Sequence, residues 1–385
     1  MGPGPANVHP LVREALSAPV LGHLDPKFIA IMDEVSEMLR QVFRTQNQAT
    51  IPISGTGSAG MEASLCNIIE PGDNVVVGIN GYFGERISDM VSRYGGNVIR
   101  AEGLWGQPLD PAVVKAALDR VPTVKLLAVV HAETSTGVLQ PLPELIALAH
   151  ERDALFLADC VTSLGGTEVN VDGWGIDVAY SGTQKCLGAP PGLSPITFGD
   201  RAVAAVRGRK TKVPNWYLDL TSLLNYWEGQ DGKRAYHHTA PISMIYALHQ
   251  ALAVILAEGL EIRHERHRNN SLALHAGLEA LGLNLVVAPQ YRAYPLTTVY
   301  IPDGVADTAV RSALLNDYDI EIGAGLGPFA GKAWRIGLMG HTSAAKNIFA
   351  FLGALESVLV AQGYQAEHGA GIAAAEHSLE AASAG

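Results

Sequence analysis

Several features are scarce in this sequence, and each scarcity narrows the possible functions. Only three cysteines occur, Cys66, Cys160 and Cys186, and none is part of a C-x-x-C pair. An odd, dispersed set of this kind is typical of a reducing compartment. No apolar run approaches the ~20 residues of a membrane-spanning helix, and the first residues lack the basic and apolar regions of a signal peptide. We therefore expect a cytoplasmic protein that does not contact a membrane.

Positive charge is also in short supply. The chain has 27 Lys and Arg residues against 38 Asp and Glu residues, which gives a net charge of −11. Proteins that bind nucleic acid carry a basic surface, so we expect no nucleic-acid partner. The histidines at 237–238 and 264–267 lack further ligands at metal-site spacing, so we also expect no metal.

Strand and helix patterns alternate along most of the chain. Strand patterns occupy 50–54, 74–79, 97–101, 124–131, 154–159, 176–180 and 194–198, and helical patterns lie at 59–69, 83–94, 110–120 and 141–152. This alternation predicts an α/β fold, with a mostly parallel sheet flanked by helices. Long helices at 241–257 and about 260–281 then lead to strand patterns at 285–288 and 297–301.

These patterns predict two domains and two shorter terminal segments. We expect a segment at 1–20 that contributes to the active site, a large domain at 21–258, a small C-terminal α+β domain at 259–363, and an Ala/Gly-rich tail at 364–385.

A glycine turn follows the first predicted strand. Gly55-x-Gly57-x-x-Gly60 formally matches a dinucleotide fingerprint, which would indicate a nicotinamide-dependent dehydrogenase. That function needs an acidic residue at the end of the next strand, where this chain has asparagine and glycine. The turn could instead hold a phosphate monoester on the backbone N–H groups of Thr56, Gly57 and Ser58 at a helix N-terminus. A tight turn without a ligand is the third alternative.

A carboxylate and an amine follow two later strands. Asp159 ends an apolar run, and Lys185 lies between a small polar turn and a Pro/Gly loop. With a phosphate-binding turn, these groups match the needs of a pyridoxal phosphate (PLP) enzyme. Asp159 could keep the pyridine nitrogen protonated, Val161 could press on the ring face, and Lys185 could form a Schiff base and move a proton. The alternative roles are an Asp turn cap and a solvated lysine.

Three more residues could complete such a site. Phe83 could stack on the pyridine ring, or simply belong to the core. Thr134 could bond the ring hydroxyl. Arg335 lies between apolar residues, and a guanidinium in that setting needs a carboxylate partner, either from the substrate or from an internal Asp or Glu.

The chain resembles class V aminotransferases of PLP fold type I, in the alanine–glyoxylate, serine–glyoxylate and serine–pyruvate group. The resemblance runs from residue 2 to about residue 362, and its motifs occur in order. They lie at 54–58, 80–84, 131–141, 159–166, 181–192, 236–239 and 325–338.

The resemblance implies a site residue by residue. It implies that Lys185 is the Schiff-base lysine and that Asp159 binds the pyridine nitrogen. Thr56, Gly57, Ser58 and Gln184 would hold the phosphate, joined by Tyr236 and Thr239 of a neighbouring subunit in a homodimer. Arg335 would bind the substrate carboxylate, with Gly4 and Thr134 beside the substrate. Phe83 stands where some members have tryptophan, and Ser58 where some have histidine.

The resemblance also implies the reaction. Substrates would be small amino acids and 2-oxo acids, with the amino group of L-alanine or L-serine passed to glyoxylate by a ping-pong mechanism. A serine–glyoxylate or serine–pyruvate enzyme is the alternative. A desulfurase would need a cysteine on a mobile loop, whereas all three cysteines lie within motifs or predicted elements.

Overall fold

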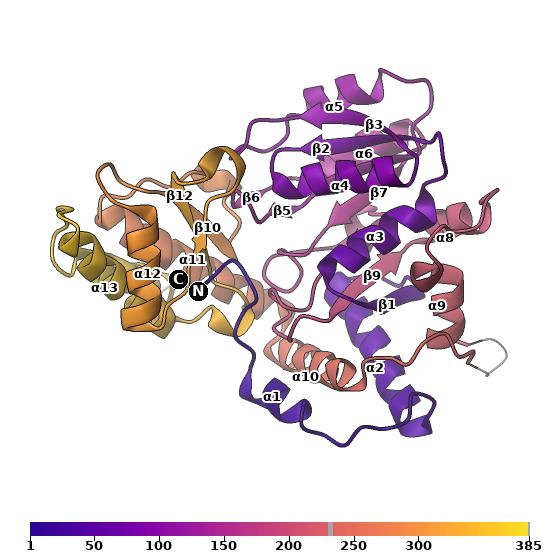
Figure 1. The fold of residues 1–385 in the computed structure, drawn as a ribbon, viewed down its shortest axis with the longest axis horizontal. Helices are drawn as coiled ribbons and strands as arrows, with labels where there is room; N and C mark the ends of the chain where they lie inside the picture. Colours follow the sequence, from indigo (N-terminus) through magenta and orange to yellow (C-terminus); the bar gives the residue numbers. More distant parts are fainter. Residues whose placement is uncertain (230–233, 384–385) are drawn as a thin grey trace.

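The computed structural model describes residues 1–229 and 234–383 and shows a large sheet-based unit beside a smaller one (Figure 1). The large sheet has seven strands in the order β1-β9-β8-β7-β4-β2-β3. Their bounds are β1 Ala49–Ser54, β2 Asn74–Ile79, β3 Asn97–Glu102, β4 Leu126–Val130, β7 Leu155–Asp159, β8 Val178–Tyr180 and β9 Leu193–Phe198. Each corresponds to a predicted strand, so the predicted α/β fold is confirmed.

The direction of the strands decides where the functional loops gather. Strands β3, β2, β4, β7 and β8 are parallel neighbours, whereas β9 runs antiparallel to both β8 and β1. Strand β1 therefore points the same way as the parallel strands. Ligands of open α/β sheets bind outside the carboxyl ends of such strands, so the loops after β1, β2, β4, β7 and β8 meet at one edge.

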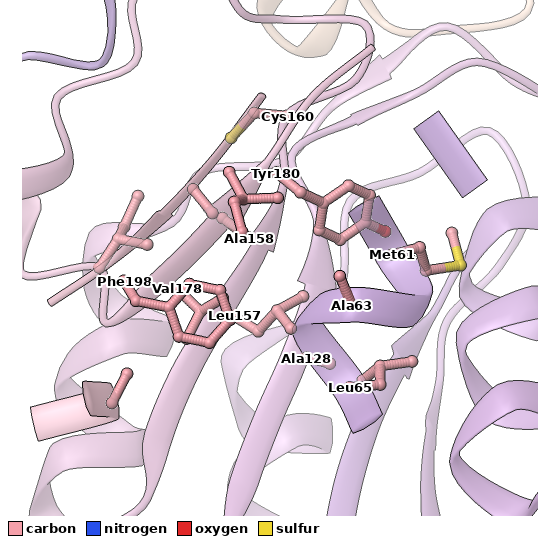
Figure 2. Close-up of a cluster of buried hydrophobic side chains, with 14 of the residues drawn as sticks. Met61, Ala63, Leu65, Ala128, Leu157, Ala158, Cys160, Val178, Tyr180 and Phe198 are labelled. Carbon is pink, nitrogen blue, oxygen red and sulfur yellow. The ribbon is translucent and has the colours of Figure 1, made fainter. Parts of the chain in front are cut away.

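Helices flank both this sheet and its core, because packing helix against sheet buries the apolar faces of both. They include α2 Pro26–Phe43, α3 Gly57–Ile68, α4 Tyr82–Arg93, α5 Pro111–Leu118, α6 Pro143–Glu151, α7 Val171–Trp174, α8 Asp200–Arg207 and α9 Leu220–Trp227. Helix α3 packs across the middle of the sheet, where Met61, Ala63 and Leu65 meet side chains from β4, β7, β8 and β9 (Figure 2). This packing fixes the start of α3 at the carboxyl edge.

The second unit has its own core. Helix α10 Ile242–Glu258 belongs to the first core, and α11 Leu260–Ala280 turns away from it by 86°. Beyond the turn, a three-stranded antiparallel sheet of β10 Leu296–Tyr300, β12 Ala333–Gly337 and β11 Gly323–Ala324 is covered by α11, α12 Asp307–Tyr318 and α13 Ala345–Ala361. Trp334 lies fully buried among these elements.

The C-terminal residues are more ordered than an Ala/Gly-rich tail suggests. Helix α14, Ala370–Ser383, packs against α11 and α13, and Ala375 is buried in the second core. Small residues allow this close approach, since a Cβ on Gly277 would lie 2.8 Å from the carbonyl oxygen of Gly371. The predicted strand at 285–288 is replaced by an isolated bridge between Leu285 and Val299, and β11 and β12 were not predicted.

The N-terminal segment connects the two units. Gly337 donates its backbone N–H to the carbonyl of Met1, whereas Ala6 donates to the carbonyl of Gln184 in the large unit. The chain then forms α1, Pro10–Ala15, against α10 (Figure 1). Among the described residues, no single helix is long and apolar enough to cross a membrane; α10 and α11 would pass such a test only together, and the sharp bend separates them.

Candidate active site

Lys185 lies in the loop between β8 and β9, beneath the N-terminal segment. Its Nζ donates a hydrogen bond to the carbonyl of Pro3, and a Cβ on Gly4 would lie only 2.5 Å from Nζ. Gly4 has a φ of +104°, a conformation that favours glycine. Burial, and next the nearby Arg335 guanidinium, lower the pKa of Lys185 to about 8. The amine is therefore closer to its reactive, uncharged form than a solvated lysine.

Asp159 ends β7 and is only 3% exposed. Oδ1 accepts the N–H of Val161 at 2.9 Å, and Oδ2 accepts the Tyr180 hydroxyl at 2.6 Å. Burial raises the pKa of Asp159 to about 6. A carboxylate has about four lone-pair sites, so two remain for a cationic donor, which would favour the charged form. Tyr180 was not predicted as a site residue; it reaches Asp159 from the neighbouring strand.

The glycine turn forms a cradle at the N-terminus of α3. Thr56 is the N-cap residue, its side chain makes no capping bond, and the first turn contains no acidic side chain. Gly57 lies against Val161, since a Cβ there would be 3.3 Å from Val161 Cγ2. Gln184 Oε1 is buried without a hydrogen-bond partner in the described chain. The backbone N–H groups of this turn and the Nε2 donor of the Gln184 amide suit an anion, whereas Gln184 Oε1 can only accept.

Gly60, the last glycine of the fingerprint, has a packing role. A Cβ there would lie 1.9 Å from Ser194 Oγ of β9, so glycine is needed for α3 to approach the sheet. Asn80, which follows β2 in place of the acidic residue of a dinucleotide site, donates to the carbonyl of Gln107. These contacts explain the glycine spacing without a dinucleotide.

Phe83 lies in the first turn of α4, beside a buried carboxylate. Its N–H donates to Glu133 Oε2 at 3.2 Å, while Ser135 donates both its N–H and its hydroxyl to Glu133 Oε1. Glu133 thus joins the loop after β2 to the loop after β4. Burial raises its pKa to about 7. Glu133 was not predicted as a site residue, although it adjoins Thr134 in the sequence.

Arg335 and Thr134 connect the small sheet to the large unit. Arg335 Nε donates to the carbonyl of Ala324 at 2.8 Å, and Nη1 donates to the carbonyl of Thr134 at 3.1 Å. Over residues 1–229 and 234–383, no carboxylate forms an ion pair with Arg335, so the internal partner considered from the sequence is not seen. The Thr134 hydroxyl pairs with that of Thr162 at 2.5 Å.

Tyr236 and Thr239 are exposed on this chain. Their hydroxyls lie 3.4 Å apart, and the Tyr236 ring contacts His23. His238, between them, bonds Ser54 at the end of β1 at 2.7 Å. The expected role of Tyr236 and Thr239 in a second subunit's site stays a prediction.

The three cysteines are buried and unpaired. Burial raises the pKa of Cys66 and Cys186 to about 12, and that of Cys160 further still. Thiols of this kind are poor nucleophiles, which argues against a desulfurase.

Known proteins are similar to this chain in both sequence and fold. The family model described as Aminotransferase class-V matches residues 14–333. The chain belongs to the class-V aminotransferase family. The (S)-ureidoglycine–glyoxylate transaminase of Bacillus subtilis is 41% identical over 400 residues, covering 99% of this chain and 94% of its own. The alanine–glyoxylate aminotransferase of Drosophila melanogaster is 41% identical over 361 residues, covering 93% and 91%. The crystal structure of an alanine–glyoxylate aminotransferase from Nostoc sp. superposes with a TM-score of 0.91 at 48% identity, covering 93% of this chain and 94% of that one.

The cofactor of this aminotransferase is PLP, and the described residues fit it. A buried amine, a buried carboxylate with free lone pairs and a helix N-terminus without an acidic side chain lie at one sheet edge. The dehydrogenase considered from the sequence is thereby replaced by PLP chemistry.

Replacing Gly4 by alanine should obstruct Lys185. The new Cβ would overlap the amine and strain the backbone, whereas a Cβ on Gly2 would make only ordinary contact, at 3.5 Å from the Glu321 carboxylate. We expect Gly4→Ala to lower aminotransferase turnover on the order of 10²-fold, as a shift of about 1 Å in a catalytic group can. Gly2→Ala is the control, and equal turnover in both variants would contradict the prediction.

The lowered pKa of Lys185 predicts a pH dependence. Below about pH 8 the amine is protonated and unreactive, so the rate constant for PLP capture by the apoenzyme should rise about tenfold per pH unit and level off above pH 8. Stopped-flow absorbance measures this rate. A rate that keeps rising to the ordinary lysine value of 10.5 would show that the amine is not perturbed.

Proposed function

We propose that this aminotransferase passes the amino group of L-alanine or L-serine to glyoxylate by a ping-pong mechanism. The observation that carries the proposal is the convergence of Lys185, Asp159 and Arg335 at the carboxyl edge of the sheet, together with relatives that are named as glyoxylate transaminases. A serine–pyruvate or serine–glyoxylate enzyme is the alternative within the same chemistry.

When bound, PLP supplies an aldehyde that takes up the amino group and a protonated ring that withdraws electrons from the substrate Cα–H bond. Lys185, whose pKa is about 8, would remove the proton from the substrate Cα and return it to the carbon of the cofactor aldehyde. Asp159 holds the proton on the ring nitrogen, supported by the Tyr180 hydroxyl and the Val161 N–H.

The remaining groups bind and orient. Thr56, Gly57, Ser58 and Gln184 hold the phosphate, and Phe83 stacks on the ring. Arg335 has N–H groups beyond the two that bond carbonyls, and these bind the substrate carboxylate. Gly4 and Thr134 line the substrate position, and the N-terminal segment excludes water from Lys185.

A second copy of the chain would complete the site. We expect a homodimer in which Tyr236 and Thr239 of one subunit bind the phosphate in the other. Their exposure in the single chain, at 61% for Tyr236, supports this expectation. The cytoplasmic location expected from the unpaired cysteines also stays a prediction.

A third candidate amino donor comes from one relative. The Bacillus subtilis enzyme named for (S)-ureidoglycine matches 99% of this chain, so (S)-ureidoglycine joins L-alanine and L-serine as a candidate. These donors share the α-amino acid group, whose carboxylate would bind Arg335 and whose Cα proton Lys185 would remove. They differ in the side chain that the rest of the pocket must accept.

Half-reactions test the function and rank the donors. The visible band of the PLP-loaded protein should disappear with an active donor and return with glyoxylate or, for the alternative, with pyruvate. The rates of these changes should identify the main donor and the main acceptor. Lys185→Ala is the control, in which both changes should be lost or slowed by about 10²-fold or more. A loaded protein whose band responds to none of the three donors would contradict the proposal.

A further inference from the structure

The phosphate cradle lacks a formal positive charge. A phosphate monoester carries about −1.5 to −2 charges near neutral pH, whereas a helix N-terminus contributes about +0.5. The residues of the cradle are all neutral: Thr56, Gly57, Ser58 and Gln184. Lys185 would bond the aldehyde of PLP in the proposed function, so its charge is not available to the phosphate. The buried Asp159 adds negative charge in the same crevice. A cation beside the cradle would therefore strengthen phosphate binding considerably.

Arg86 is the cation that touches the cradle. It lies half-buried on α4, and Nη1 donates a hydrogen bond to Ser58 Oγ at 3.2 Å, across 28 residues of sequence. Ser58 is in the first turn of α3, so the guanidinium lies one hydrogen bond from the N-terminus of that helix. The positive charge of Arg86 also acts on Asp159. Burial raises the pKa of Asp159, and Arg86 is one of the groups that lower it again in part.

The guanidinium is not neutralised by a carboxylate. Glu85, its sequence neighbour, instead binds Arg100 through two hydrogen bonds of 2.9 and 2.6 Å. Arg93, two turns further along α4, pairs with Asp89. Within the described parts of the chain, Arg86 forms no ion pair with an acidic side chain.

Two aromatic rings hold Arg86 in place. Its guanidinium carbon lies 5.0 Å from the ring centroid of Phe83 and 5.3 Å from that of Tyr82. Such contacts stabilise a cation while leaving its N–H groups free to bond elsewhere. Arg86 therefore contacts both Phe83, the proposed stacking ring, and Ser58 of the phosphate cradle.

We propose that Arg86 binds the phosphate group of PLP and supplies the charge that the cradle lacks. This role rests on the proposed cradle at residues 56–58. The competing explanation is that Arg86 only supports the Phe83 ring by the cation–π contact. The two differ in one respect: a phosphate ligand discriminates PLP from pyridoxal, which has the same ring without the phosphate, whereas a ring support does not.

The test compares the affinities of the apoenzyme for PLP and for pyridoxal by absorbance titration. Arg86→Gln should weaken PLP binding by about 10- to 100-fold and change pyridoxal binding by less than about threefold. Inorganic phosphate should compete with PLP in the unaltered protein more strongly than in the variant. Arg93→Gln, on the same helix and exposed, is the matched control and should leave both affinities unchanged. Thermal unfolding of each apoenzyme checks that the variants are folded.

Two outcomes for Arg86→Gln would contradict the proposal. Equal losses for PLP and pyridoxal would assign Arg86 to ring support alone, and unchanged PLP affinity would exclude it from the site. If Arg86→Gln does not fold, Arg86→Lys carries the test, because lysine keeps the charge without the planar fork. That variant should weaken PLP binding several-fold and leave pyridoxal binding unchanged. An unaltered protein that binds neither compound would overturn the proposed function, and the role of Arg86 with it.

Discussion

The structure depends on the burial of two opposite charges that do not bond each other. Lys185 bonds the carbonyl of Pro3, and Asp159 bonds the Tyr180 hydroxyl and the Val161 N–H. Burial shifts both pKa values toward neutrality, to about 8 and about 6. Holding both groups in this way costs stability. A ligand with an aldehyde at one end and a basic ring nitrogen at the other would bond both groups, and PLP has these features.

The two packed units make this arrangement possible. The strands that hold Asp159 and flank Lys185 are fixed by the core beneath α3, which includes Tyr180 (Figure 2). The Tyr180 hydroxyl donates a hydrogen bond to Asp159. The N-terminal segment covers Lys185. Its Met1 carbonyl accepts a hydrogen bond from Gly337 of the small unit, and its Ala6 N–H donates to the carbonyl of Gln184 in the large unit. Arg335 crosses the same boundary through its bond to Thr134. Movement of the small unit would therefore move both the N-terminal segment over Lys185 and the Arg335 guanidinium.

Much of this could be predicted from the sequence because local patterns were strong. All seven strands of the large sheet were predicted, and the central parallel strands β4 and β7 are buried, nearly continuous apolar runs. Polar residues at strand ends, such as Asp159, marked the carboxyl edge. The short strand pairing of residues 323–324 with 334–335 lacked such a run. The residues at 285–288 are apolar, but they form a single bridge, since an apolar segment can be buried without joining a ladder.

The missed site residues share a different cause. Tyr180, Glu133 and Arg86 act through contacts with residues distant in sequence, and no local pattern encodes such contacts. Tyr180 looks like the end of an apolar strand, and Glu133 like a turn residue. Arg86 offered one signal, its position three residues after Phe83, which places both side chains on the same face of a helix.

Whether Lys185 is the residue that condenses with PLP can be measured by trapping the bond. The PLP-loaded protein is reduced with borohydride, which fixes the cofactor permanently to the amine it has joined, and its peptides are then mapped by mass spectrometry. We predict one pyridoxyl group per chain, on the peptide that contains Lys185. A label on another lysine, or a loaded protein in which Lys185 remains unmodified, would contradict it.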